Sequence, residues 1–344
     1  MKKLFVLFAV TLLASCVAHK NVVINSIKPA EIDIDSKIQK VIIVNRTDAS
    51  GNFLNVVEGI VTGEMPFEDR AAVDAFIAGL NNEMRISERF ETQIARQILK
   101  GNSPTNAFPE PLDWWTLEGL LREYNADAVL AIELLDSDFI VTESKKVIEK
   151  KEEGGKIIKV DEYHASGLAN LVIGIRIYDP RTKTILDQKR YKDTRTWEGV
   201  ALTKTEALAA LINKSDANNF LANEVGVAYA HRIAPMPVLL NRVYVGKSKD
   251  APAVEQGARF ADVGQWAEAI QIWEKAIPTS PQKEAGILAQ NIAVGYEILG
   301  DMEKAAGWAQ RAYTQFGNRN AKKYYEELQI RLISEAKASD QLSK

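Results

Sequence analysis

Cysteine and histidine, which carry much of the nucleophilic and metal chemistry of proteins, are scarce in this sequence. The 344 residues include one cysteine and three histidines. A single cysteine excludes an internal disulfide and a thiolate metal cluster within one chain. The His-Glu-x-x-His metal motif, the Gly-x-Ser-x-Gly elbow, the Walker loop and the dinucleotide fingerprint are missing as well. We therefore predict a protein that is not an enzyme, with no catalytic or metal-ligating residues and no small-molecule cofactor.

An excess of charge of either sign is also missing. Lys and Arg number 43 against 46 Asp and Glu, which gives a net charge of −3 at pH 7. In the stretch 143–153 four lysines are interspersed with four glutamates, as on a solvated surface. Nucleic-acid binding needs a basic patch, so the composition predicts no nucleic-acid partner.

The first residues contain a short apolar run and lie before the only cysteine. Leu4–Leu13 follows Met1-Lys2-Lys3 and is too short to cross a bilayer, which takes about 20 apolar residues. A basic start and a short apolar run are typical of a secretory signal peptide. The run ends in Leu13-Ala14-Ser15-Cys16, which resembles a bacterial lipobox. That resemblance implies removal of residues 1–15 and a covalent lipid on Cys16; the alternative is an ordinary signal peptide with an incidental Cys16.

The residue after Cys16 bears on where such a lipoprotein would be sorted. Val17 stands there, and by resemblance to Gram-negative lipoproteins the lack of aspartate favours the outer membrane. No acidic cluster of the kind associated with surface export follows, so we expect an anchor that faces the periplasm. Residues 16–36 are then the lipidated N-terminus and its tether, and the membrane is a partner through the lipid.

Residues 37–248 alternate between strand and helix patterns, which predicts an α+β or α/β periplasmic domain. Buried strands are expected at 41–44, 56–62, 90–95 and 126–135, and helices at 67–84, 112–124, 204–213 and 217–233. Two hairpins follow the fourth strand, at about 138–164 and at 168–197. The first turns at Glu152-Glu153-Gly154-Gly155 and is charged throughout, so we expect it to project into solvent. A last short strand is expected at 241–245.

Residues 249–338 show an internal repeat instead, which predicts an all-α helical array. Small residues recur at an offset of 36, as in the pairs Gly264/Gly300, Ala269/Ala305 and Ala276/Ala312. This pattern resembles two tetratricopeptide repeats, and 318–338 has the amphipathic pattern of a capping helix. Stacked helix pairs form a concave face that accepts a peptide.

The resemblance to tetratricopeptide repeats implies which residues line that concave face. The implied partner groove consists of apolar and small residues with two polar exceptions: Val254, Ala258, Ala261, Ile287, Gln290, Val294 and Glu297. The Lys/Asn set that clamps a C-terminal carboxylate in some repeats is not present at these positions. Either the groove binds an apolar segment of a partner, or the chain's own α/β domain covers it.

Four short segments resemble an uncharacterised family of envelope lipoproteins that joins an N-terminal α/β domain to C-terminal tetratricopeptide repeats. They are Arg46, Phe90, the run Asn125-Ala126-Asp127-Ala128-Val129 and the run Arg176-Ile177-Tyr178-Asp179-Pro180. The succession of strands and helices over about residues 40–235 is also loosely similar to that of the periplasmic domains of curli-secretion and peptidoglycan-synthase-activating lipoproteins. From the lipobox and the repeats we predict a lipid-anchored adaptor that recruits an envelope protein through its repeats.

Two alternatives stay open at this point. The charged hairpin at 138–164 would suit a self-assembling secretion or pore-type subunit. The pair Trp114-Trp115 would suit a protein that binds or acts on cell-wall glycan, although a packed tryptophan with one exposed neighbour is the commoner explanation.

Overall fold

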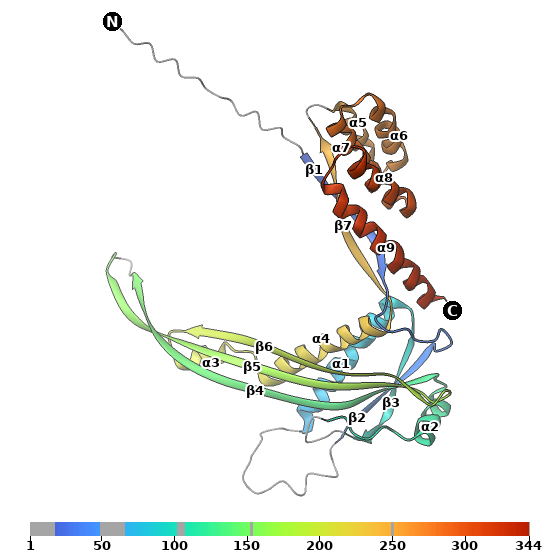
Figure 1. Cartoon of the computed structure of the whole chain (residues 1–344). Helices are drawn as coiled ribbons and strands as arrows, with labels where there is room; N and C mark the ends of the chain where they lie inside the picture. The colour runs from blue at the N-terminus through green and yellow to red at the C-terminus, as the bar shows by residue number, and fades with distance from the viewer. Residues whose placement is uncertain (1–17, 49–65, 102–106, 152–153, 249–250, 344) are drawn as a thin grey trace, which may run out of the picture. The chain divides into compact units, whose positions relative to one another are not determined.

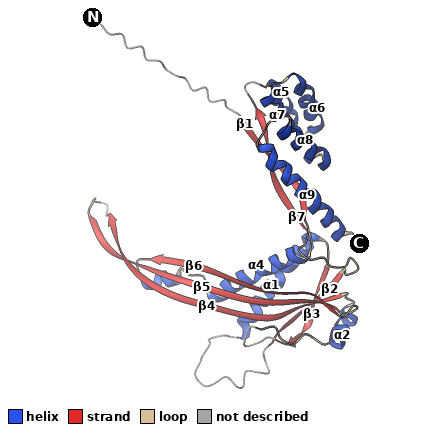
Figure 2. Ribbon diagram, viewed as in Figure 1, coloured by secondary structure: helices blue, strands red, loops and turns tan. Residues whose placement is uncertain are grey.

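The computed structural model describes residues 18–48, 66–101, 107–151, 154–248 and 251–343. The chain divides into two compact units. The helical unit comprises the residues up to Lys28 and Pro237–Lys337, and the sheet unit comprises Pro29–Met236 and Ala338–Lys344. The fold is mixed α+β, with a β-rich N-terminal region and a helical C-terminal region, which confirms the predicted class at this level (Figure 2).

The sheet unit is built on a five-stranded mixed sheet of order β3-β2-β4-β5-β6. β2 is parallel to both of its neighbours, whereas β4, β5 and β6 are successively antiparallel (Figure 1). Parallel neighbours need crossover connections, and the helices α1 and α2 lie in those connections. The strands are β2 (Lys40–Asp48), β3 (Glu91–Lys100), β4 (Ala128–Lys151), β5 (Ile157–Asp179) and β6 (Thr184–Ala201).

Helices cover both faces of the sheet, but unequally. On one face α1 (Pro66–Ser87) and α4 (Lys214–Ile233) pack against each other over the main core, which includes Phe76 and Tyr229. A Cβ at Gly226 would lie 2.2 Å from the Phe76 carbonyl oxygen, so this close helix contact requires glycine. On the other face α2 (Trp114–Tyr124) covers a smaller core, to which β2, β3, β4 and the end of β5 contribute residues.

The hairpin of β4 and β5 extends past the rest of the sheet (Figure 1). The pairing of β4 with β5 continues to Lys151 and Ile157, whereas β6 ends opposite Tyr163. The outer part of the hairpin is therefore a two-stranded ribbon, mostly exposed, in the segment where the sequence predicts a projecting hairpin. The short helix α3 (Lys204–Ala209) follows β6 and is shorter than the predicted helix 204–213. The predicted strand 56–62 lies outside the described residues.

The helical unit repeats one helix–turn–helix motif, and its second helices begin 36 residues apart. Gly264 and Gly300 occupy the same place in the two turns with φ of 79° and 82°, a left-handed conformation that favours glycine. The 36 residues that separate the repeated small residues in the sequence therefore also separate the turns and the second helices of the two motifs. The helices are α5 (Pro252–Ala261), α6 (Trp266–Ala276), η2 (Ile277–Thr279), α7 (Gln282–Ile298), α8 (Met302–Thr314) and α9 (Asn320–Leu342).

A two-stranded sheet of β1 (Ala18–Lys28) and β7 (Met236–Lys247) accompanies these helices. The sequence places the boundary between the domains near residue 248 and treats 16–36 as a tether. The structure differs, because β1 pairs with β7 and both pack on the helical unit. Burial alternates along β1, with Ile24 and Ser26 facing inward, which is the pattern of a half-buried strand.

Candidate functional site

The predicted groove residues do come together on α5 and α7, but they do not form an open groove. Val254, Ala258, Ala261, Val294 and Glu297 are buried, and Ile287 and Gln290 are partly buried. Their apolar members share one core with Tyr244 and Val245 of β7 and with Val22 of β1. An open partner groove at these residues is therefore not what the structure has, because the chain's own strand occupies that face.

Asn291 of α7 binds the backbone of β7 at Val245. Its Oδ1 accepts a hydrogen bond from the Val245 N–H at 2.8 Å, and its Nδ2 donates to the Val245 carbonyl at 2.8 Å. Asn291 is fully buried, so both bonds form away from water. An amide that pairs with both polar groups of one residue recognises an extended backbone whatever its side chains are.

Glu297, also on α7, joins β7 to α9. Its fully buried carboxylate accepts hydrogen bonds from Arg242 of β7 at 2.8 Å and from Tyr324 and Arg331 of α9, both at 2.5 Å. Burial raises the pKa of Glu297, but the hydrogen bonds from Arg242, Tyr324 and Arg331 and the charge of Arg242 outweigh it. The pKa therefore lies below the usual 4.5. The sequence assigns Glu297 to a partner, whereas the structure makes it an internal anchor for β7.

The residues that hold β7 are mostly ones that sequence analysis missed. Asn291 lies among buried residues of α7, and Arg242 and Tyr244 alternate along a strand that was expected to be shorter. The Tyr244 hydroxyl donates to Asp262 at 2.9 Å, and its ring packs edge-on against Trp266. An asparagine on the buried face of a helix could have indicated this contact from the sequence, because a buried amide needs a hydrogen-bond partner.

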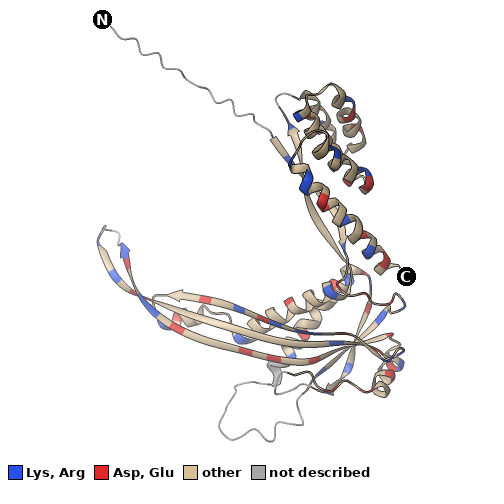
Figure 3. Ribbon diagram, viewed as in Figure 1, with Lys and Arg blue, Asp and Glu red and all other residues tan. Residues whose placement is uncertain are grey.

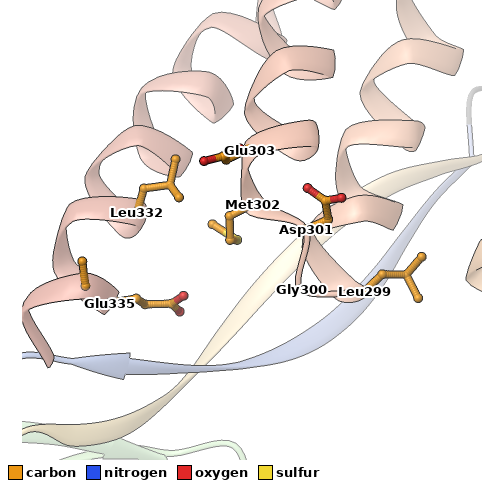
Figure 4. Close-up of a pocket in the computed structure, with 8 residues that line it drawn as sticks. Leu299, Gly300, Asp301, Met302, Glu303, Leu332 and Glu335 are labelled. Atoms are coloured by element: carbon orange, nitrogen blue, oxygen red, sulfur yellow. The ribbon is translucent and has the colours of Figure 1, made fainter. Parts of the chain in front are cut away.

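An open pocket of about 590 Å³ lies elsewhere in the helical unit, at the turn between α7 and α8 and beside α9. Figure 4 shows Met302 of α8 between the turn and the α9 residues Leu332 and Glu335. The apolar lining is combined with three carboxylates, those of Asp301, Glu303 and Glu335. Glu335 accepts hydrogen bonds from Ser26 and Arg331, both at 2.7 Å, so it is held in place. Asp301 is paired with Lys304 at 2.6 Å and Glu335 with Arg331, so the pocket combines an apolar floor with the carboxylate of Glu303 and two carboxylates that already have cationic partners.

The most buried polar cluster of the sheet unit surrounds Glu133. Its carboxylate accepts hydrogen bonds from Arg46 at 2.5 Å and from the Tyr178 hydroxyl, with Arg176 3.7 Å away. Burial, together with the neighbouring carboxylate, raises the pKa of Tyr178 to about 12. All these donors point at one fully buried carboxylate, so the cluster ties strands together and is no candidate for catalysis.

The other candidates of the sequence have simple partners. Trp114 packs edge-on against Tyr178, and Trp115 is 78% exposed. His164 pairs with Glu162 at 2.8 Å and His231 with Glu83 at 3.0 Å. Within the described residues no group of His, Cys, Asp and Glu could hold a metal ion. Cys16 lies outside the described residues, so its lipidation stays a prediction.

No helix in the described part of the chain is both long enough and apolar enough to span a membrane.

Two family models match the chain. Residues 38–244 match "Domain of unknown function (DUF8603)", and residues 255–330 match "Domain of unknown function (DUF6340)". This supports the prediction of an uncharacterised family with a two-domain layout. No curated protein matches the chain in sequence.

Several solved structures resemble part of the chain at low sequence identity. A PelC dodecamer from Paraburkholderia phytofirmans is 13% identical, covering 60% of this chain and 96% of that one with a TM-score of 0.25. A neuraminyllactose-binding hemagglutinin homologue from Helicobacter pylori is 10% identical, covering 60% and 90% with a TM-score of 0.28. The rare lipoprotein B from Shewanella oneidensis is 16% identical, covering 38% and 86% with a TM-score of 0.13. Similarities of this size do not establish a shared fold.

Proposed function

The chain belongs to the family described as "Domain of unknown function (DUF8603)", and from this premise we propose that it is a non-enzymatic, lipid-anchored adaptor of the bacterial envelope. In this proposal residues 1–15 are removed and lipid on Cys16 anchors the protein in the outer membrane, facing the periplasm. The helical unit, with two tetratricopeptide-like repeats and the cap α9, binds another envelope protein.

The position of β1 supports the anchored adaptor. β1 begins at Ala18, two residues after Cys16, and its inner face packs in the core of the helical unit. Two extended residues span only about 7 Å. A lipid on Cys16 would therefore hold the helical unit close to the membrane surface.

The proposal that the helical unit binds a protein rests on the pocket beside α9. The groove face is occupied by β7, so a partner needs another surface, and this pocket is open. Leu299 at its edge is 51% exposed, and Glu303 is exposed beside it. An apolar floor with carboxylates at its rim suits a partner segment that presents an apolar side chain next to Lys or Arg.

A photocrosslinking amino acid at Leu299 tests this assignment in cells. The matched control is Val263, which precedes Gly264 as Leu299 precedes Gly300 and is 71% exposed. We expect a discrete adduct with one envelope protein from position 299, lost with Leu332→Asp, and none from position 263. Equal adducts from both positions, or an adduct that survives Leu332→Asp, would contradict the assignment.

The anchor has its own test. Cys16→Ser is expected to move the protein from the membrane fraction to the soluble periplasmic fraction and to abolish labelling by a radioactive fatty acid. Unchanged fractionation of this variant would refute the lipid anchor, whatever the crosslinking shows.

A second candidate function is self-assembly, which the edges of the sheet favour. Among the described residues, no strand pairs with β4 beyond Ile132 on the side away from β5, or with the outer side of β6. Beyond the buried Glu133, β4 carries only acidic charges as far as Glu143 (Asp136, Asp138 and Glu143), whereas Lys189–Arg195 of β6 carries four basic residues and one acidic (Figure 3). Free edges invite pairing, and opposite charges favour joining β4 of one copy to β6 of the next.

Charge reversal separates this candidate from the first. Asp138→Lys alone and Lys192→Glu alone would each abolish a self-assembled species in analytical ultracentrifugation, and the double variant would restore it. A wild-type protein that stays monomeric at every concentration would rule the candidate out.

A further inference from the structure

The ribbon of β1 and β7 has one buried face and one exposed face. Val22, Ile24 and Tyr244 contribute to the inner face, which packs on the helices. The alternate residues are exposed, and four of them are apolar and form what we call the apolar stripe: Val23 (57% exposed), Ile27, Leu239 (71% exposed) and Val243. Uncharged Asn21, Asn25 and Asn241 lie between them on the same face. The two strands run in opposite directions within the helical unit (Figure 1). Exposed apolar side chains concentrated on one face mark an interaction surface.

The charge of the ribbon is of one sign only. β1 and β7 contain no aspartate and no glutamate, but they contain Lys20, Lys28, Arg242 and Lys247. Arg242 is bound to Glu297, and Lys20 is bound to Asp262. Lys28 and Lys247 are exposed, and Lys247 forms an ion pair of 3.6 Å with the partly buried Glu255. The exposed positive charge of the ribbon therefore lies on the last residue of each strand, Lys28 and Lys247, and an occupant of the stripe should carry negative charge opposite these strand ends.

We propose that this exposed face lies on the membrane, with its apolar stripe at the boundary of the acyl chains and its lysines at anionic phospholipid headgroups. The proposal rests on the proposed anchor, since Cys16 precedes β1 by two residues and brings the ribbon to the bilayer. Amphipathic surfaces bind in this way through buried apolar area and through the attraction of lysines to anionic lipids. The lipid would tether the protein, and the ribbon would fix the orientation of the helical unit.

Charge argues against a second copy as the occupant. Two copies that met through this face would bring two sets of lysines together without a carboxylate from either ribbon. An anionic bilayer supplies the missing negative charge and the apolar layer together.

Vesicle binding of the full-length Cys16→Ser protein tests the proposal without the acyl anchor. The probes are vesicles of phosphatidylethanolamine with phosphatidylglycerol, and vesicles of phosphatidylcholine alone. We expect binding to the anionic vesicles that weakens with salt, and weaker binding to the neutral ones. Leu239→Thr with Val243→Thr keeps a high strand propensity and should weaken vesicle binding about tenfold, because two apolar side chains no longer enter the lipid.

The matched control is Ile330→Gln with Ile333→Gln, which removes two exposed apolar residues from α9. We expect this control to bind as the Cys16→Ser parent does, and circular dichroism would show that both double variants are folded. Equal binding of both double variants, or no vesicle binding by the parent, would overturn the proposal. A dimer that the threonine variant alone abolishes would identify a second copy as the occupant and overturn it too. Failure of the anchor is distinguished by fatty-acid labelling and fractionation, because the vesicle assay contains no acylated protein.

Discussion

Asn291 and Val245 are joined by two hydrogen bonds of 2.8 Å, one to the backbone N–H and one to the backbone carbonyl of Val245. The two residues belong to α7 and β7, and both are buried. The amide of Asn291 thus takes the place of a neighbouring strand for one residue of β7. This relationship explains why the face expected to receive a partner peptide holds a segment of the same chain.

Removing the Asn291 amide should destabilise the helical unit strongly. Asn291→Leu leaves the Val245 N–H and carbonyl buried without partners, and each such group costs about 1–3 kcal/mol. We expect the free energy of unfolding to fall by about 2–4 kcal/mol in urea denaturation of the Cys16→Ser protein.

Gln290→Ala is the control for this change. Gln290 is adjacent in sequence and only partly buried, and its side chain accepts one hydrogen bond, from Asn318. We expect a loss of about 1 kcal/mol or less. Equal losses for the two variants would show that Asn291 does not hold β7 in place.

The Glu297 carboxylate makes the stability of the helical unit depend on pH in the acid range. Its pKa in the folded protein lies below the usual 4.5, so its stabilising effect is complete above that value and is lost as the pH falls through the folded pKa. Glu297→Gln should cost about 3 kcal/mol at pH 7, because it removes the one fully buried carboxylate that Arg242 and Arg331 share and leaves them only the more exposed carboxylates of Glu327 and Glu335. The difference from wild type should shrink below about pH 4.5. Urea denaturation at several pH values measures this, and a difference independent of pH would contradict it; exposed Glu303→Gln serves as the control.

The helical repeat was predictable because it depends on local patterns. Gly264 and Gly300 mark turns that need a residue in the left-handed conformation, and small residues recur where helices contact each other. The repeat length of 36 residues can therefore be recognised from the sequence. The ribbon of β1 and β7 was not predictable in the same way. Its strands are separated by more than 200 residues, and β1 mixes asparagine and lysine with its apolar residues. Pairing at such a distance leaves no local pattern.

The candidate site was predicted only in part, for a related reason. The resemblance to tetratricopeptide repeats correctly predicted that residues of α5 and α7, such as Val254 and Val294, share one face of the helical unit. The spacing of residues along each helix determines which of them lie on that face. What covers the face depends on a strand from outside the repeat. Hence Glu297, which pairs with Arg242 of that strand, was interpreted as a partner contact.

The two turn glycines should respond equally to substitution by alanine. Gly264→Ala and Gly300→Ala meet no atom within 4 Å, so any loss comes from the positive φ alone. We expect each to lower the free energy of unfolding by about 1 kcal/mol. Gly307→Ala, inside α8 and also without a neighbour within 4 Å, should instead raise it by about 0.5–1 kcal/mol. Thermal denaturation of the three variants measures these signs, and a loss at Gly307 would contradict the helical assignment there.

In the sheet unit, Tyr178 should matter more than Tyr191, although burial raises the pKa of both phenols to about 12. The Tyr178 hydroxyl donates to the buried Glu133 carboxylate, whereas Tyr191 packs edge-on against Tyr229. Tyr178→Phe removes a donor from a buried charge and should cost about 1.5–3 kcal/mol, and Tyr191→Phe should cost less than about 1 kcal/mol.

Both raised pKa values stabilise the fold fully below pH 10, and this stabilisation is lost as the pH rises from 10 towards 12. Urea denaturation at neutral pH ranks the two variants, and ultraviolet titration should show that both phenols ionise above the usual pH. If Tyr178→Phe were as stable as wild type, Glu133 would not depend on this hydroxyl, and Arg46 and Arg176 alone would neutralise it.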